Sequence, residues 1–289
     1  MIYHQTEHGV LYHWDCIDIL PTLADKSVDM ILCDLPYGTT ACKWDVIIPF
    51  ESLWKQYKRI IKDNGAIVLT ASQPFTSALV MSNPSMFKYE WIYQKRCASN
   101  FAQAKYAPMK EHENVLVFAN GIVRYYPQKE ERRGSGTERV LHNFTDKSSN
   151  KKGEFVGNFK RLKDFEMNPS ELRYPSSIQE FNNRAVGDRG FHPTQKPVAL
   201  FEYLIKTYTN ENELVLDNCS GSGTTAVACI NTKRRYILIE NGLNPRYCLI
   251  HDPLDFCCMK KYFQNNNERS DINDLYCLFG HIHGRQMVS

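Results

Sequence analysis

The chain has 289 residues, of which 43% are hydrophobic and 23% are charged, a composition that is ordinary for a soluble globular protein and argues against global disorder. Its ten cysteines form no Cys-x-x-Cys pair, so neither a zinc site nor a disulfide scaffold is expected, and reduced thiols indicate a cytoplasmic protein. The first ten residues are polar and no run of about eighteen apolar residues occurs, so we expect neither a signal segment nor a membrane span.

The positive charge of the chain is concentrated in its middle. The formal net charge is +3, but residues 94–190 contain 18 Lys or Arg against 12 Asp or Glu. That segment therefore has a net charge of +6, and the rest of the chain has a net charge of −3. A basic segment can bind a polyanion, although a solvated loop region has the same composition.

Short apolar runs alternate with segments of helical periodicity along most of the chain. This pattern predicts an α/β fold with a mostly parallel sheet and helices on both faces. The run at 28–33 is too short for a buried helix and too apolar for an exposed strand, so we expect it in the centre of the sheet. A short apolar run lies at 10–14, and the predicted strands are 28–33, 66–70, 89–94, 114–119, 213–216 and 235–239. The predicted helices are 50–61, 73–81, 198–208 and 224–231.

Residues 125–190 interrupt this alternation. Polar and basic residues dominate there, and aromatic residues are interleaved with them. Insertions of this length in a compact domain are usually functional. We interpret the segment as an inserted recognition region, with a long flexible loop as the alternative.

A glycine-rich turn at residues 217–226 joins a predicted strand to a predicted helix. Gly221 and Gly223 allow a tight turn and a close approach of the backbone to a ligand. Glu240 ends the next predicted strand, where an acid can accept hydrogen bonds from ribose hydroxyls. The pattern predicts a nucleoside-binding half-site that fits S-adenosylmethionine or NAD, with an ordinary glycine turn as the alternative.

A second motif, Asp34-Leu35-Pro36-Tyr37, follows an apolar strand directly, at the edge where ligands bind in open α/β sheets. An exocyclic amino group of a base is a poor nucleophile because its lone pair is delocalised into the ring. Acceptors at Asp34 and at the Pro36 carbonyl would draw its N–H groups toward tetrahedral geometry and free the lone pair. Tyr37 would stack on a base flipped out of the duplex, which is worth about 1–3 kcal/mol. A plain β-turn with Asp34 as a cap is the alternative interpretation.

Together these motifs resemble those of the amino-group DNA methyltransferases, the N6-adenine and N4-cytosine family, in the permuted order with the catalytic motif first. Asp34-Leu35-Pro36-Tyr37 is similar to the family's Asp-Pro-Pro-Tyr, and His192-Pro193-Thr194-Gln195-Lys196-Pro197 is similar to the segment that opens the helix before the cofactor strand. Asn218-Cys219 replaces the family's Pro-Phe, which is expected to loosen packing near the methionine moiety. The resemblance implies catalytic roles for Asp34, Pro36 and Tyr37, and cofactor contacts for Asp15, Lys196, Asp217, Gly221, Ser222, Gly223, Thr224, Thr225 and Glu240.

The resemblance also implies a fold, a cofactor and partners. The fold is a Rossmann-like methyltransferase sheet with a catalytic half at residues 1–124, an inserted target-recognition region at 125–190 and a cofactor-binding half at 191–245. The methyl donor is S-adenosylmethionine, the substrate is double-stranded DNA, and a homodimer and a partner restriction endonuclease are further expectations. An acid at the first catalytic position is more typical of adenine enzymes and serine of cytosine enzymes, which favours adenine N6 over cytosine N4. Basic residues near the catalytic edge are expected either as phosphate contacts or as solubilising residues, and they are Lys95, Arg96, Lys105 and Lys110.

The tail, residues 246–289, departs from that family. Its run Gly280-His281-Ile282-His283-Gly284 resembles a metal-binding loop near the end of calcineurin-like metallophosphoesterases, but the other ligand motifs of those enzymes are not recognisable, so no metal ligand is predicted. We interpret the tail as a poorly packed remnant, with a coincidental His-rich tail as the alternative. An NAD-dependent oxidoreductase and a metallophosphoesterase fragment are the competing functions, and the first leaves the Asp34 loop and the basic segment unexplained.

Overall fold

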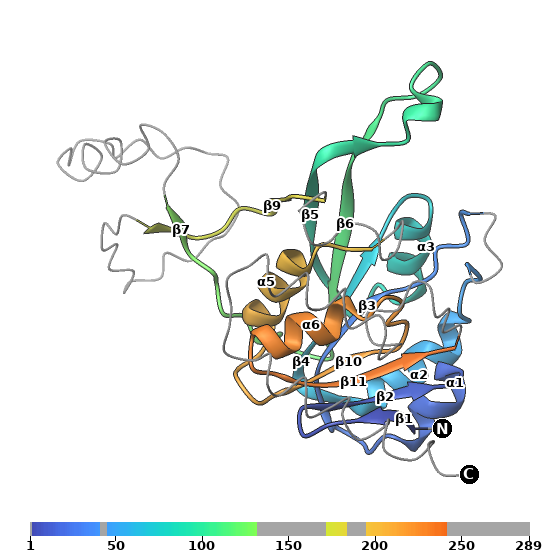
Figure 1. The fold of residues 1–289 in the computed structure, drawn as a ribbon, viewed down its shortest axis with the longest axis vertical. Coiled ribbons are helices and arrows are strands. Elements are labelled where there is room, and N and C mark those ends of the chain that lie inside the picture. The colour runs from blue at the N-terminus through green and yellow to red at the C-terminus, as the bar shows by residue number, and fades with distance from the viewer. Residues whose placement is uncertain (1, 41–44, 132–171, 184–194, 242–289) are drawn as a thin grey trace, which may run out of the picture. The chain divides into compact units, whose positions relative to one another are not determined.

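The computed structural model describes residues 2–40, 45–131, 172–183 and 195–241 (Figure 1). The described residues up to 126 and from 177 onward form one compact unit, and those within 127–176 belong to a second. In its described residues the second unit contains a short antiparallel pair of strands, β7 (Glu130–Glu131) and β8 (Leu172–Arg173). The predicted site residues all belong to the first unit.

One mixed sheet runs through the first unit. In the described part of the chain its strands follow the spatial order β1 (Ile2–Gln5), β2 (Gly9–His13), β11 (Arg235–Glu240), β10 (Leu214–Asp217), β3 (Val28–Asp34), β4 (Ile61–Ala71), β6 (Lys110–Phe118), β5 (Phe87–Ser99) and β9 (Ile178–Phe181). The five neighbours from β2 to β4 in this order are all parallel, which confirms the predicted parallel centre. β6 is antiparallel to both β4 and β5, and β1 is antiparallel to β2.

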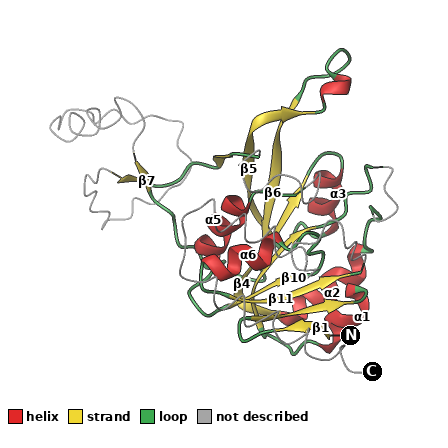
Figure 2. Ribbon diagram, in the orientation of Figure 1, coloured by secondary structure: helices red, strands yellow, loops and turns green. Residues whose placement is uncertain are grey.

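Helices cover both faces of this sheet (Figure 2). One face packs against α1 (Cys16–Ile19), α2 (Phe50–Ile60) and α3 (Phe75–Ser82), and the other packs against α5 (Val198–Tyr208) and α6 (Thr224–Asn231). Successive strand residues point to opposite sides, so each face has its own apolar core. In β3, Ile31 belongs to the core that contains α2, whereas Met30 and Leu32 belong to the core that contains α5 and α6.

Most predicted elements are present, and the largest differences in length are in β5 and β6. The helices predicted at 198–208 and 224–231 have those bounds, and α2 ends one residue earlier than predicted. β5 and β6 extend well beyond their predicted ranges, because their outer halves are polar and lack the apolar pattern on which the prediction depended. These outer halves form a hairpin that projects from the sheet (Figure 1), with a 3₁₀ turn at Phe101–Gln103 in the connection between the strands. A second 3₁₀ turn at Leu20–Thr22, α1, β1 and β9 were not predicted.

The predicted insertion at 125–190 is described only in part. Its strand β9 pairs in parallel with β5 at one edge of the main sheet. The boundaries of the insertion stay a prediction, and the tail 246–289 with its His-rich run lies outside the described residues. Among the helices that the structure describes, none has the length and the apolar character needed to cross a membrane.

We expect Tyr208→Phe to lower the free energy of unfolding by about 1–3 kcal/mol, because it leaves a buried donor without its acceptor. The fully buried Tyr208 hydroxyl accepts a hydrogen bond of 2.7 Å from Trp91 Nε1 and lies 3.3 Å from the Tyr89 hydroxyl. Urea unfolding measures the change. Tyr106→Phe is the matched control, since that side chain is 89% exposed and its loss should change stability by no more than about 0.5 kcal/mol. Equal midpoints for the two variants would contradict the expectation.

Candidate active site

Polar side chains lie where several strands reach the same edge of the sheet, on the face covered by α5 and α6. Met30 and Leu32 of β3 belong to the core on that face, and Asp34 is the next residue in the same alternation. The same alternation continues to Thr70 on β4, and on β6 it leads to Glu113. The packing of three strands thus brings an acid, a hydroxyl and a second acid to one place.

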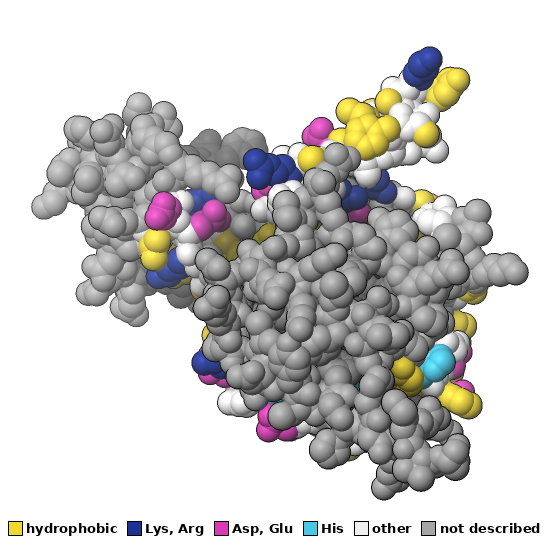
Figure 3. Space-filling model, in the orientation of Figure 1, with side chains coloured by type: hydrophobic (Ala, Val, Ile, Leu, Met, Phe, Trp, Pro, Cys, Tyr) yellow, Lys and Arg dark blue, Asp and Glu magenta, His cyan; other side chains and the backbone are white. Residues whose placement is uncertain are grey.

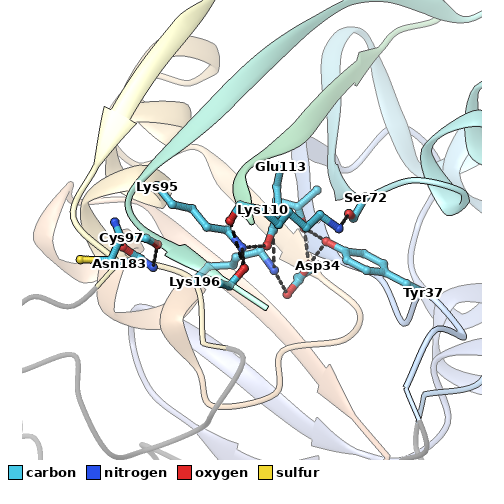
Figure 4. A network of polar contacts seen from close by, with 11 residues as sticks. Asp34, Tyr37, Ser72, Lys95, Cys97, Lys110, Glu113, Asn183 and Lys196 are labelled. Carbon is cyan, nitrogen blue, oxygen red and sulfur yellow. Dashed lines mark hydrogen bonds and ion pairs between the residues drawn. The ribbon is translucent and has the colours of Figure 1, made fainter. Parts of the chain in front are cut away.

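Asp34 is the centre of this group (Figure 4). Its Oδ1 accepts hydrogen bonds from the Tyr37 hydroxyl at 2.7 Å and from the Thr70 hydroxyl, and its Oδ2 accepts one from Lys196 Nζ at 2.7 Å. An ionised carboxylate has about four acceptor positions. The three bonds within the described residues therefore leave room on Asp34 for one further donor.

Lys196 lies between two carboxylates. Its Nζ is 2.7 Å from Asp34 Oδ2 and 3.2 Å from Glu113 Oε2, and its side chain is only 9% exposed. Burial alone would lower the pKa of Lys196, but Asp34 and Glu113 raise it well above its usual value, so the ammonium stays charged. The residue predicted from sequence as a cofactor contact therefore touches the predicted catalytic acid directly.

Glu113 was not among the predicted site residues. Its other oxygen, Oε1, lies 2.5 Å from Lys95 Nζ, and the Lys95 side chain is only 11% exposed. Burial raises the pKa of Glu113, but Lys196 and Lys95 outweigh that effect and hold it below its usual value. An acid placed on the core-facing side of an apolar strand was the available sequence signal for Glu113.

The four basic residues predicted near the catalytic edge divide into two kinds. Lys95 is engaged by Glu113, and Lys110 Nζ donates to the buried Ser72 hydroxyl. Arg96 and Lys105 are exposed on the projecting hairpin. Only the second pair is therefore placed to meet a partner without breaking a contact inside the site.

The remainder of the catalytic motif is held by packing. The Tyr37 ring stacks on Phe75 with a centroid distance of 5.2 Å and an interplanar angle of 26°. Leu35, where the family has proline, is buried in the core on the opposite face. Pro36 between them is partly exposed at the sheet edge.

Asp45, another residue that sequence analysis missed, fixes the loop after Tyr37. Its carboxylate accepts backbone N–H bonds from Gly38, Thr39 and Thr40 at 2.8, 2.9 and 2.7 Å. Burial raises the pKa of Asp45, but a hydrogen bond from the Thr40 hydroxyl together with these backbone bonds outweighs it and lowers the pKa below its usual value. Gly38 has a φ of +66°, a conformation that favours glycine, so the turn and its cap form together.

The glycine turn lies after β10 and leads into α6. Gly221 and Gly223 have φ values of +50° and +86°, which explains the glycines at these positions. A Cβ added at Gly221 would meet nothing within 4 Å, so there is open space against the backbone here. The Gly221 N–H donates to Glu240 Oε2 at 2.7 Å. The turn and the acid at the end of β11 therefore adjoin each other, as the nucleoside half-site requires.

The Asp217 carboxylate is hydrogen-bonded to residues of the glycine turn. It is 2% exposed, its Oδ1 accepts from the Cys219 N–H at 3.1 Å, and its Oδ2 accepts from the Thr225 hydroxyl. Burial raises the pKa of Asp217 to about 7, although these hydrogen bonds oppose the shift. Ser222 and Thr224 are also buried, with their hydroxyl oxygens 3.3 Å apart. These four predicted cofactor residues thus use their side chains to hold the turn in shape.

Asp15 lies beside Glu240 at the ends of neighbouring strands. It caps α1 by accepting from the Ile17 N–H at 2.9 Å, and Asn241 Nδ2 lies 3.4 Å from its other oxygen. The Trp14 N–H donates to the Glu240 carbonyl at 3.2 Å, which joins the two strand ends. Asp15 and Glu240 therefore border the same region as the glycine turn.

Asn218, which stands where the family has proline, is buried and hydrogen-bonded. Its side chain is 2% exposed and its Oδ1 accepts a hydrogen bond from the buried Tyr57 hydroxyl. The looser packing expected from the loss of proline is therefore not present at this residue, because α2 supplies a hydrogen-bonding partner.

Comparisons with known proteins agree on one family. A family model of the N6/N4 type, described as DNA methylase, matches residues 28–250. Type II methyltransferase M1.MboII of Moraxella bovis is 27% identical over 246 residues, which are 80% of this chain and 91% of that protein. DNA adenine methyltransferase YhdJ of Escherichia coli (strain K12) is 24% identical over 261 residues, which are 83% of this chain and 80% of that protein.

A solved structure supports the fold. The crystal structure of the M1.HpyAVI–SAM complex is similar with a TM-score of 0.56 and 21% sequence identity, over 88% of this chain and 98% of that chain. The arrangement of sheet and helices described above is therefore similar to the fold of that structure.

We expect Asp217→Asn to change how stability depends on pH. In the wild type the pKa of Asp217 is about 7 in the folded state and near 3.8 in the unfolded chain. Between these values the folded state binds a proton that the unfolded state lacks, so the free energy of unfolding falls as pH rises, by up to about 1.4 kcal/mol per pH unit. The amide in Asp217→Asn does not titrate, so the variant does not lose stability in this way as pH rises. Its free energy of unfolding relative to that of the wild type should therefore increase from pH 5 to pH 8.

Urea unfolding at both pH values tests this, with Asp63→Asn as the control because the Asp63 side chain is 77% exposed. A difference between wild type and Asp217→Asn that stays constant with pH would contradict the expectation.

Proposed function

This chain belongs to the amino-group (N6/N4) DNA methylases, which transfer a methyl group from S-adenosylmethionine to DNA, and from that premise we propose that it methylates adenine N6 at a specific DNA site. The observation that carries the proposal is Asp34 at the sheet edge, whose carboxylate accepts three hydrogen bonds from the described residues and so has one further acceptor position there. Aspartate at this position is typical of the adenine enzymes that the motif resembles. Cytosine N4 is the alternative, because the family includes both activities.

Asp34 and the Pro36 carbonyl accept the two N–H groups of the target amino group in this proposal. The target base is flipped out of the duplex and stacks against Tyr37, whose ring already lies against Phe75. When bound, S-adenosylmethionine supplies an electrophilic methyl group. Asp34 and the Pro36 carbonyl would hold the amino nitrogen so that its lone pair could attack that methyl group, with the electron pair of the broken bond left on the donor, and Asp34 would accept the amino proton. The residues here act mainly through positioning and in-line alignment.

The glycine turn fits S-adenosylmethionine. The space beside Gly221 lets a nucleoside approach the backbone, and Glu240 at the end of the adjacent strand is suited to ribose hydroxyls. Asp15 borders the same region and is the candidate contact for the adenine moiety of the cofactor. Asp217 and Thr225 hold the turn in shape through the hydrogen bond between their side chains.

The projecting hairpin of β5 and β6 is the candidate DNA contact among the described residues. Figure 3 shows hydrophobic and Lys or Arg side chains next to one another on it. Arg96 and Lys105 are exposed, as are Phe101 and Tyr106, which are 58% and 89% exposed. Cations can contact phosphates, and aromatic rings can contact bases or sugars.

The proposal keeps the division into a catalytic half at 1–124, target recognition at 125–190 and a cofactor half at 191–245. It also includes a homodimer, which light scattering of the purified chain tests. A partner restriction endonuclease is included because M1.MboII is a Type II methyltransferase. Protection of methylated DNA from a type II endonuclease of the same specificity tests that partner.

We expect Asp34→Ala to lower the rate of methylation by about 10²–10⁴-fold, because the target amino group loses its main acceptor. Binding of DNA and of the cofactor should be largely retained. The measurement uses purified protein, labelled S-adenosylmethionine and unmethylated DNA, followed by digestion to nucleosides and mass spectrometry. Asp63→Ala is the control, since Asp63 is exposed and pairs with Lys26 at the surface.

Labelled N6-methyladenine would support the proposal, whereas labelled N4-methylcytosine would keep the mechanism and change the base. Normal methylation by Asp34→Ala would overturn the catalytic role of Asp34.

We expect Arg96→Ala and Lys105→Ala each to reduce the salt dependence of DNA binding. Each lost phosphate contact should lower the slope of log K against log salt by about 1, with little change in sequence preference. Fluorescence anisotropy of a labelled duplex at several salt concentrations measures the slope. Lys26→Ala is the control, because this 62% exposed lysine precedes β3 at the opposite edge of the sheet. Unchanged slopes in both hairpin variants would remove this surface from the interface.

A further inference from the structure

Four charges of alternating sign form a buried chain from the base of the hairpin to the catalytic acid. The contacts are 2.5 Å between Lys95 and Glu113, 3.2 Å between Glu113 and Lys196, and 2.7 Å between Lys196 and Asp34 (Figure 4). The exposed fractions of the four side chains are 11%, 13%, 9% and 28%. Charges so poorly solvated are stable only when they are paired, so each depends on its neighbours.

We propose that Glu113 is a positioning residue for methyl transfer, acting through Lys196 on Asp34. The inference rests on the catalytic role proposed for Asp34 and adds to it a residue that need not touch the substrate. Glu113 comes from β6, Lys196 from the segment before α5 and Asp34 from the end of β3. Three separate parts of the chain therefore define where the ammonium group lies.

The position of Lys196 decides how well Asp34 can accept the target amino group. Lys196 uses one acceptor position of Asp34 Oδ2, and the other oxygen already receives two hydroxyl donors. Glu113 attracts the same ammonium from the other side, so the positive charge is shared by two carboxylates. Asp34 thereby keeps both an open position and the acceptor strength that the amino group requires.

Removing Glu113 changes this balance in a specific direction. The full charge of Lys196 would then act on Asp34 alone, which favours its ionised form but weakens it as an acceptor for the substrate. Removing Lys196 or Lys95 has the opposite effect on ionisation, because each takes away a positive charge. The charged or titratable groups that face Asp34 are Lys196 and Tyr37, with Glu113 and Lys95 behind Lys196.

The test compares steady-state methylation by the full chain carrying Glu113→Gln, Lys95→Gln or Lys196→Met. For Glu113→Gln we expect kcat to fall by about tenfold while KM for DNA changes by less than about threefold. The acid side of the kcat–pH profile should move to lower pH by at least about 0.5 unit in Glu113→Gln and to higher pH in the two lysine variants. Glu111→Gln is the matched control, two residues earlier on β6 and exposed.

A residue that only ties β6 to β5 would lower stability without these opposite shifts, so urea unfolding is measured on every variant. If Glu113→Gln does not fold, Lys95→Gln carries the test, and an unshifted profile there overturns the proposal. Methylation by the wild type and its loss in Asp34→Ala establish the proposed function independently. With those two results in hand, a normal kcat and an unshifted profile in Glu113→Gln overturn the role of Glu113 alone.

Discussion

Because successive side chains of a β-strand point to opposite faces, the last residue of each strand in this sheet can lie on only one of them. The apolar positions of β3, β4 and β6 must pack against α5 and α6, and that requirement fixes their register. Asp34, Thr70 and Glu113 continue the same alternation beyond the apolar core. The burial that stabilises the fold therefore also brings the polar groups of the site together.

Two acids on this face have partners of different kinds. Asp34 at the end of β3 is paired with Lys196, which also lies next to Glu113. Asp217 at the end of the neighbouring β10 has a hydroxyl and an amide as its partners among the described residues, and burial raises its pKa to about 7. Neutral donors suit an acid that shapes a turn. A neighbouring cation stabilises the charged form of a carboxylate, as the acceptor role proposed for Asp34 requires.

The sequence predicts those parts of the site that a short segment forms by itself. Asp34 with Tyr37, and Gly221 with the turn around it, are set by strand–turn patterns of fewer than ten residues. Lys196 could be recognised by its motif, but its contact with Asp34, 162 residues away, depends on how α5 packs on the sheet. Thr70 gave no signal of its own, because a threonine at the end of a strand is common.

The length of the hairpin could not be predicted for a related reason. Only the parts of β5 and β6 that pack on the core show apolar alternation, whereas their outer halves pair with each other in solvent. Lys95 lies where the core-packed part of β5 meets its outer half. It belongs to a polar stretch of sequence, yet its diagonal position across from Glu113 buries it. A charge count alone therefore places this lysine with the exposed basic residues.

The aspartate proposed as the catalytic acid has a physical consequence beyond its hydrogen bonds. A serine there would be neutral and could be desolvated without a counter-ion, whereas a partly buried carboxylate is stabilised by a neighbouring cation. Lys196 meets that need, but a single lysine would also occupy the acceptor that the substrate requires. Glu113 shares the lysine, and Lys95 then balances Glu113. In this interpretation, the aspartate at position 34 accounts for Lys196, and through it for the charged residues Glu113 on β6 and Lys95 on β5.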